Sequence, residues 1–200
     1  MEMNGKKRLL LLFLLAGSLT GVRGQTAGFK TNVVDDALLN VNVGVEIGLA
    51  PRWTLDVPAS YNGWILDEGA RWKHATVQPG VRYWFCDRFG GHFVGVHTHG
   101  GLYNVGGVDW KVNPNWISSE VFSQLKDARF QGWFVGGGAS YGYAWILGDH
   151  WNLEAEVGVG YAYTRYDRYR CTGCGKKVLS DMPHHYVGVT KASVNLVYLF

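Results

Sequence analysis

Two cysteines and two histidines near the end of the chain have the residue types expected of a metal site. Cys171 and Cys174 lie in the motif RCTGCG, and His184 and His185 follow it. Two thiolates and two imidazoles form the Cys₂His₂ ligand set of tetrahedral zinc. In an exported chain the same thiols can instead form a disulfide, and a C-x-x-C pair can also be redox-active. All three interpretations stay open, and zinc is the one cofactor that the sequence suggests.

Four further titratable residues fall in pairs with a spacing of two. His97 and His99 lie in HFVGVHTHGG, and Glu154 and Glu156 lie in WNLEAEVGVG. Either pair could serve acid–base chemistry. Pairing inside a fold is the simpler explanation, because buried polar groups need partners wherever they occur. Since no serine nucleophile or triad acid accompanies them, we expect no catalytic residues and no enzyme activity.

The elements that hold these residues are predicted to be β-strands. In WNLEAEVGVGYAYTRYDRY every second residue from Trp151 to Tyr163 is apolar, and the residues between them are polar or small. A period of two places these sets on opposite faces of a strand. The same pattern predicts eight strands in the chain, at residues 28–35, 41–50, 53–63, 73–85, 92–105, 130–146, 151–168 and 186–200.

The connections between these strands alternate between short turns and longer loops, which is typical of outer-membrane barrels. Charged residues are only 18% of the chain, and 28 of its 200 residues are glycine, against ~25% and ~7% in soluble domains. The sequence therefore predicts an all-β fold over residues 25–200: a monomeric, eight-stranded, antiparallel up-and-down transmembrane β-barrel of the outer-membrane type.

The polar strand faces predict a barrel interior rather than a surface in water. Gly132, Gly136, Gly138 and Gly142 share one such face, which suits the lumen of a narrow barrel. The charges on these faces nearly balance, and a buried charge needs a partner. We therefore expect an internal ion-pair network in which Lys30, Arg82 and Lys191 meet Glu46, Asp56, Glu154 and Glu156.

Both ends of the chain fit export to an outer membrane. Residues 1–24 join a basic stretch to a short apolar run, which is the pattern of a signal peptide. They also carry the whole formal charge of +3, so the mature chain gives no evidence for a nucleic-acid partner. The alternation that ends on Tyr198 and Phe200 resembles the C-terminal signature that the barrel-assembly machinery reads.

Three stretches of the chain resemble a family of Bacteroidota outer-membrane proteins known as a domain of unknown function. They begin FKTNVVDD, RWKHATVQPG and FQGWFVGGG, and they include the motifs Val77-Gln78-Pro79 and Cys171-Thr-Gly-Cys174. The resemblance implies an eight-stranded barrel in contact with outer-membrane lipid. Genes of this family often lie beside fimbrial genes, which implies fimbrial or other surface proteins as partners. The resemblance brings no catalytic residues.

The function expected from these observations is a structural or interaction role at the cell surface, linked to the assembly of fimbriae or another surface structure. The alternative is a small outer-membrane enzyme that acts on lipid or lipopolysaccharide. A further alternative is a soluble periplasmic binder of the lipocalin type, whose apolar strand faces would point inward. Recovery in a water-soluble fraction would distinguish this last class of protein from the other two.

Overall fold

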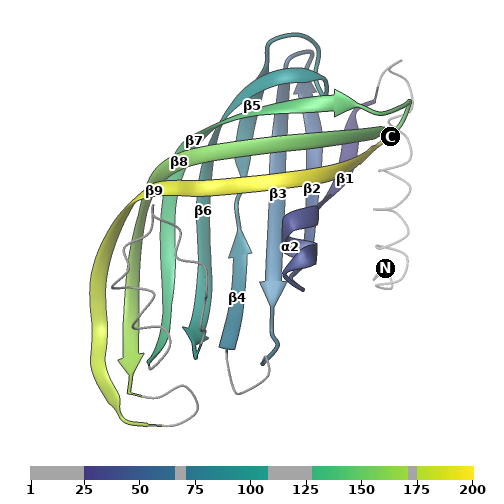
Figure 1. The fold of residues 1–200 in the computed structure, drawn as a ribbon. Coiled ribbons are helices and arrows are strands. Elements are labelled where there is room, and N and C mark those ends of the chain that lie inside the picture. Colours follow the sequence, from purple (N-terminus) through teal and green to yellow (C-terminus); the bar gives the residue numbers. More distant parts are fainter. Residues whose placement is uncertain (1–24, 66–70, 108–127, 171–174) are drawn as a thin grey trace, which may run out of the picture.

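The computed structural model describes residues 25–65, 71–107, 128–170 and 175–200, and these are almost entirely antiparallel strands (Figure 1). The predicted signal peptide, residues 1–24, lies outside the described residues. No helix in the described ranges is long and apolar enough to cross a membrane. The elements are β1 (Ala27–Asn32), α2 (Val33–Ala37), β2 (Val41–Ala50), β3 (Trp53–Asn62), β4 (Arg71–Val77), β5 (Gly80–Trp84), β6 (Gly91–Gly106), β7 (Arg129–Ile146), β8 (Trp151–Tyr169) and β9 (Lys177–Leu199).

The strands close into a ring of eight positions, which confirms the prediction of an all-β antiparallel fold. Consecutive strands pair with each other except β4 and β5, which share one position because both pair with β3 and with β6. The ring closes where the first and last strands pair, with Phe29 opposite Tyr198. Phe200 is therefore held beside β1, where its N–H donates to the carbonyl oxygen of Ala27 at 2.9 Å.

The prediction of one strand over residues 73–85 is wrong, because Gln78 and Pro79 interrupt it. Proline has no N–H to donate to a strand partner. Its carbonyl oxygen still accepts from the N–H of Thr98 at 2.9 Å, and pairing resumes at Gly80. The side chain of Gln78 leaves the wall and donates to the carbonyl oxygen of Thr190 on β9 at 2.7 Å.

Two other predicted strand boundaries are wrong. The first strand ends at Asn32 rather than at residue 35, because the Asn32 side chain caps α2 by accepting from the N–H of Val34. The last strand begins at Lys177, nine residues before the predicted start at 186. Its first part pairs only with β8, and of residues 177–187 all but Leu179 are exposed. We call this extension and the end of β8 that pairs with it, residues 165–187 as far as they are described, the ribbon.

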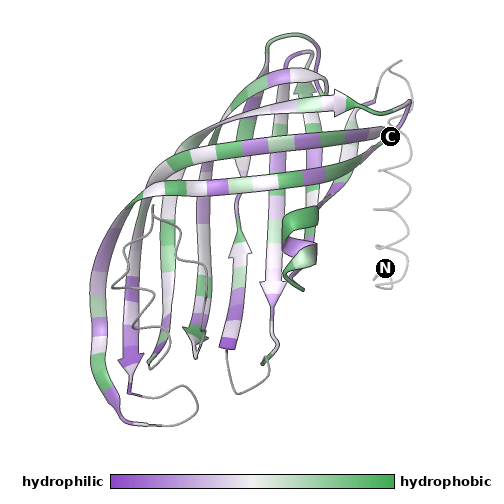
Figure 2. Cartoon of the chain, viewed as in Figure 1, coloured by the Kyte–Doolittle hydropathy of each residue, from purple (hydrophilic) through white to green (hydrophobic). Residues whose placement is uncertain are grey.

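Apolar side chains cover the outside of the ring, and polar ones lie inside it, as the alternation predicts. On β8, Val157 and Val159 are 53% and 61% exposed, whereas Glu154 and Glu156 are buried. Figure 2 shows the resulting alternation of hydrophobic and hydrophilic residues along β8 and β9. Buried apolar residues gather near the short turns, where the rings of Trp84 and Phe93 lie 4.6 Å apart.

The inward glycines of β7 allow close approach of its neighbours. A methyl group added at Gly136 would overlap the carbonyl oxygen of Tyr161 and lie 2.5 Å from Nε2 of His99. Gly100 faces outward on β6, and a methyl group there would come no nearer than 3.5 Å to any other residue. The two positions therefore form a matched pair of inward and outward glycines.

We predict that Gly136→Ala destabilises the chain and that Gly100→Ala does not. Overpacking in a filled interior costs about 1–3 kcal/mol, whereas the outward position has room for the added methyl group. Urea unfolding of both variants, followed by tryptophan fluorescence, measures the difference. Equal midpoints for the two variants would contradict the assignment of these faces.

Candidate functional site

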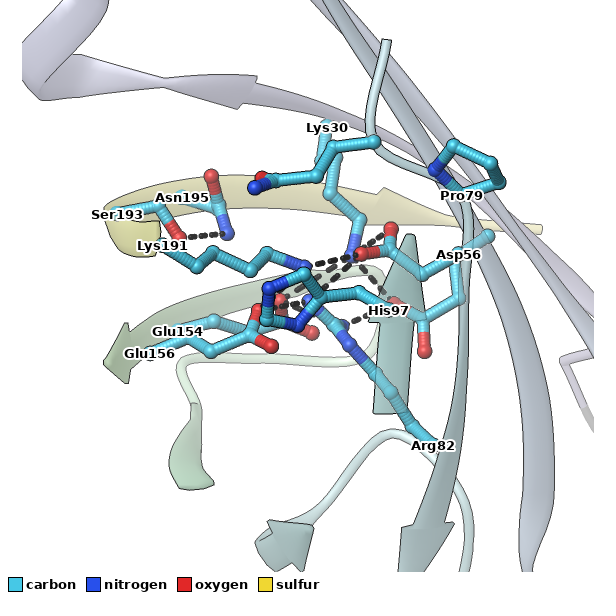
Figure 3. Close-up of polar contacts among 12 residues, drawn as sticks. Lys30, Asp56, Pro79, Arg82, His97, Glu154, Glu156, Lys191, Ser193 and Asn195 are labelled. Atoms are coloured by element: carbon cyan, nitrogen blue, oxygen red, sulfur yellow. Dashed lines mark hydrogen bonds and ion pairs between the residues drawn. The ribbon is translucent and has the colours of Figure 1, made fainter. Parts of the chain in front are cut away.

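Seven charged side chains from six strands meet inside the ring, and we call them the charge cluster. Each has 7% or less of its residue surface exposed. The members are Lys30 on β1, Glu46 on β2, Asp56 on β3, Arg82 on β5, Glu154 and Glu156 on β8, and Lys191 on β9. Figure 3 shows most of these side chains pointing toward one another from different parts of the wall.

Arg82 joins carboxylates from opposite parts of the ring. Its Nη1 lies 2.7 Å from Oε2 of Glu46 and 3.2 Å from Oε2 of Glu154. Its Nη2 lies 3.0 Å from Oδ2 of Asp56 and 2.5 Å from Oε2 of Glu156. The planar guanidinium can serve several carboxylates at once because its five N–H groups point in fixed, divergent directions.

The two lysines complete the charge cluster. The Nζ of Lys30 lies 2.5 Å from Glu46, 2.9 Å from Asp56 and 3.3 Å from Glu154. The Nζ of Lys191 lies 3.0 Å from both Asp56 and Glu156. These contacts confirm the predicted internal ion-pair network with all seven of its members.

Neutral groups support the cluster on the side of the short turns. Thr54 donates its hydroxyl to Oε1 of Glu46 at 2.5 Å and accepts from the indole N–H of Trp84 at 3.0 Å. The guanidinium carbon of Arg82 lies 4.6 Å above the ring of Phe93. Together these contacts orient Glu46 and Arg82 and fill the lumen beneath the charges.

His97 and His99 both point into the lumen beside the charge cluster, as the sequence predicts. The Nε2 of His97 lies 3.0 Å from the hydroxyl of Thr190, which gives this buried ring a partner inside the fold. His99 packs against the ring of Phe134, and the Nδ1 atoms of both histidines lack hydrogen-bond partners among the described residues. A cavity of about 260 Å³ adjoins His99, Lys30 and Lys191.

The arrangement offers little for acid–base catalysis. Glu154 and Glu156 are engaged in ion pairs with Arg82. Among the residues that the structure describes, no group of three or more His, Cys, Asp or Glu side chains is placed to hold a metal ion. The charge cluster is therefore best suited to holding the wall of the ring together.

The predicted zinc or disulfide residues are only partly described. Cys171 and Cys174 lie outside the described residues. His184 and His185 are consecutive residues of β9, so their side chains point to opposite faces of the strand. The Nδ1 of His185 lies 2.6 Å from the hydroxyl of Tyr161. A zinc site that used all four residues would have to break this strand geometry, and both the zinc and the disulfide interpretations stay predictions.

The ribbon carries two exposed ion pairs. The Nζ of Lys177 lies 2.6 Å from a carboxylate oxygen of Asp167, and Arg165 lies 2.7 Å from Asp181. The hydrogen bond from Lys177, with further help from the backbone N–H of Asp181, holds the pKa of the Asp167 carboxyl below its usual value. The ribbon pairs thus link β8 and β9 on a surface open to solvent.

Sequence reasoning missed the hydrogen bond from the Gln78 side chain to the carbonyl oxygen of Thr190 on β9. Thr190 lies at an irregularity of register between β8 and β9, and no local motif marks it. Pro79 is the one signal that could have indicated the break in the strand, because proline is unfavourable inside a sheet.

Comparisons with known proteins give one match. No curated protein and no solved structure matches the chain. A family model does match it, over residues 9–200, and its description is "Protein of unknown function (DUF3575)".

We predict that Arg82→Gln destabilises the chain far more than Arg165→Gln. Removing Arg82 leaves four carboxylates buried without their shared partner, and loss of one member of a buried pair costs about 3–5 kcal/mol. Arg165 has 40% of its side chain exposed in its pair with Asp181, and such pairs contribute at most about 1 kcal/mol. Urea unfolding of each variant gives the two free energies, and similar losses would contradict a stabilising role for the charge cluster.

Proposed function

We propose that this chain, which belongs to the DUF3575 family of proteins of unknown function, is an outer-membrane β-barrel with a structural or interaction role at the cell surface. The observation that carries the proposal is the inverted distribution of polarity. Of the buried residues other than glycine in the described ranges, fifteen are polar or charged and seven are apolar, while the large exposed residues are mainly apolar. A soluble protein would bury its apolar faces, whereas a lipid-facing wall exposes them.

The spacing of aromatic residues on the outside supports insertion in a bilayer. Along β7 the outward residues Trp133 and Tyr143 are ten positions apart, and along β8 the outward residues Trp151 and Tyr161 are also ten apart. Ten residues rise about 33 Å along a strand, or about 25 Å at the usual tilt. The apolar band of an outer-membrane barrel is ≈ 25 Å tall between its aromatic girdles.

The outward residues between these aromatic positions are compatible with lipid. On β8 they are Leu153, Ala155, Val157 and Val159, and none is charged. The polar Glu154 and Glu156 between them point into the lumen. This distribution leaves the ion pairs away from hydrocarbon, where an unpaired charge is costly.

The ribbon supports a role in recognition at the surface. A transmembrane strand needs about 9–11 residues, and β9 has 23. The excess carries exposed apolar side chains, of which Val187 is 81% exposed. In the proposed orientation the ribbon projects from the outer face, at the opposite end from the short turns. A fimbrial or other surface protein is the class of partner that the family resemblance suggests for it.

A structural role fits the filled lumen better than transport or catalysis does. Arg82, Trp84, Phe93 and the carboxylates of the charge cluster occupy the interior near the short turns, so we propose no channel. Since the acidic residues of the cluster are held in ion pairs, we also propose no enzyme activity and no cofactor inside the ring.

We predict that the protein is extracted from cells only with detergent and that it is heat-modifiable. The folded ring should migrate faster on a denaturing gel than the boiled chain, because a closed antiparallel wall resists unfolding by the gel detergent. Cell fractionation with boiled and unboiled samples is the measurement. Release of the protein into water without detergent would favour the periplasmic binder and contradict the proposal.

Trypsin added to intact cells tests which end of the ring faces the outside of the cell. Arg168 and Lys177 lie on the ribbon, whereas Arg52 and Arg88 lie at the short turns. Cleavage at the ribbon, with Arg52 and Arg88 protected, is the expected pattern. Cleavage at Arg52 or Arg88 in intact cells, with the ribbon protected, would show that the proposed orientation is reversed.

A further inference from the structure

An apolar groove crosses the outward face of β2, β3, β4 and β6. Its volume is about 600 Å³. In one row across the strands Ala75 lies between Tyr61 and Leu102, and in the next row Val77 lies between Ala59 and Gly100. Tyr61 and Leu102 are large and exposed, so the small side chain of Ala75 leaves a furrow between them. We call this feature the groove.

The groove ends at a group of charged and amide side chains. Lys73 lies two residues beyond Ala75 on the same face of β4, and it pairs across the sheet with Asn104. A second cavity, of about 470 Å³, shares Tyr61, Ala75 and Leu102 with the groove, and its lining includes Lys73, Asn104, Gln131 and Arg165 together with the carboxylates of Asp167 and Asp181. The apolar furrow is therefore continuous with a polar region.

At this end the carboxylates of Asp167 and Asp181 already pair with Lys177 and Arg165, so the charge left without an ionic partner among the described residues is positive. No carboxylate of the described residues forms an ion pair with Lys73 or with Arg71, which lies one step further along β4. Arg165 pairs with Asp181, but its Nε lacks a hydrogen-bond partner within the described ranges, as does the Nε of Arg71. The polar end of the groove can thus accept an anionic group that also offers hydrogen-bond acceptors.

The height of the groove on the wall matches that of an interface between hydrocarbon and headgroups. Tyr61, an exposed aromatic residue near the end of β3 that leads into the longer connection, lies directly opposite Ala75. Lys73 lies about 7 Å further along its strand. Tyrosine and tryptophan mark the membrane interface, so Lys73 lies at the level of lipid headgroups.

We infer that the groove binds an acyl chain of a phosphorylated glycolipid of the outer leaflet, with a phosphate of that lipid against Lys73. The inference rests on the proposed function, because it requires the wall to face a bilayer. The furrow beside Ala75 offers an apolar surface for the acyl chain. Lys73, with Arg71 behind it, offers the opposite charge for the phosphate.

The test measures retention of diphosphoryl lipid A by the folded, full-length mature chain, by native mass spectrometry from detergent micelles. Ala75→Leu fills the furrow, and the expected fall in apparent affinity is about tenfold, equivalent to nearly two buried methylene groups. Lys73→Gln removes the charge, with an expected fall of about fivefold. Retention of the monophosphoryl lipid by the unaltered chain should also be weaker.

Two matched controls keep the test specific. Ala139→Leu makes the same change on the outward face of β7, between Val96 and Val159, and Arg52→Gln removes a cation at the short-turn end. Neither should alter retention of lipid A.

The inference is overturned if both groove variants retain lipid A as well as the unaltered chain does, or if the controls lose as much. It is also overturned if a fully dephosphorylated lipid is retained equally well. Every sample is also run, boiled and unboiled, on a denaturing gel to check that the chain is folded. Failure of the unaltered chain to enter micelles as a heat-modifiable species would refute the proposed function, whereas correct insertion without lipid retention would refute the groove alone.

Discussion

The rest of the structure depends on one interaction, the contact of the Arg82 guanidinium with four carboxylates in the middle of the ring. Glu46 and Asp56 come from β2 and β3, while Glu154 and Glu156 come from β8. These two groups belong to strands that do not pair with each other. Arg82 therefore links walls that backbone hydrogen bonds cannot join, and removal of one partner from a buried ion pair is strongly destabilising.

The charge cluster and the apolar wall are two results of the same alternation. Each inward charge on β8 has an outward apolar neighbour, so Glu156 is followed by Val157. A shift of pairing by one residue would place charges outside and apolar residues in the lumen. The ion pairs consequently oppose slippage of the strands, and the glycines of β7 bring the backbone close enough for a filled interior. The ribbon lies beyond this constraint, so it can present exposed side chains without altering the ring.

Much of this arrangement can be predicted from the sequence, because strand alternation is a local property. The pattern around Trp151 to Tyr163 identifies the inward Glu154 and Glu156, and balanced charge then predicts their partners Lys30, Arg82 and Lys191. Interruptions depend on tertiary contacts and are harder to predict. Gln78 leaves its strand to bond Thr190 across the lumen, and Asn32 ends β1 by capping a five-residue helix. The length of β9 was missed because residues 177–185 lack alternation, although pairing with β8 extends the strand.

The most direct test of the account is the depth of fluorescent labels in bilayers that contain brominated lipid tails. Val157 on the wall and Val178 on the ribbon are almost equally exposed, at 53% and 54%. In a chain whose own cysteines are replaced by serine, a label on Val157→Cys should be strongly quenched by the brominated tails and one on Val178→Cys should not. Quenching of Val157→Cys by a water-soluble quencher instead, with no effect of the lipid tails, would contradict the claim that the apolar faces of the ring touch lipid.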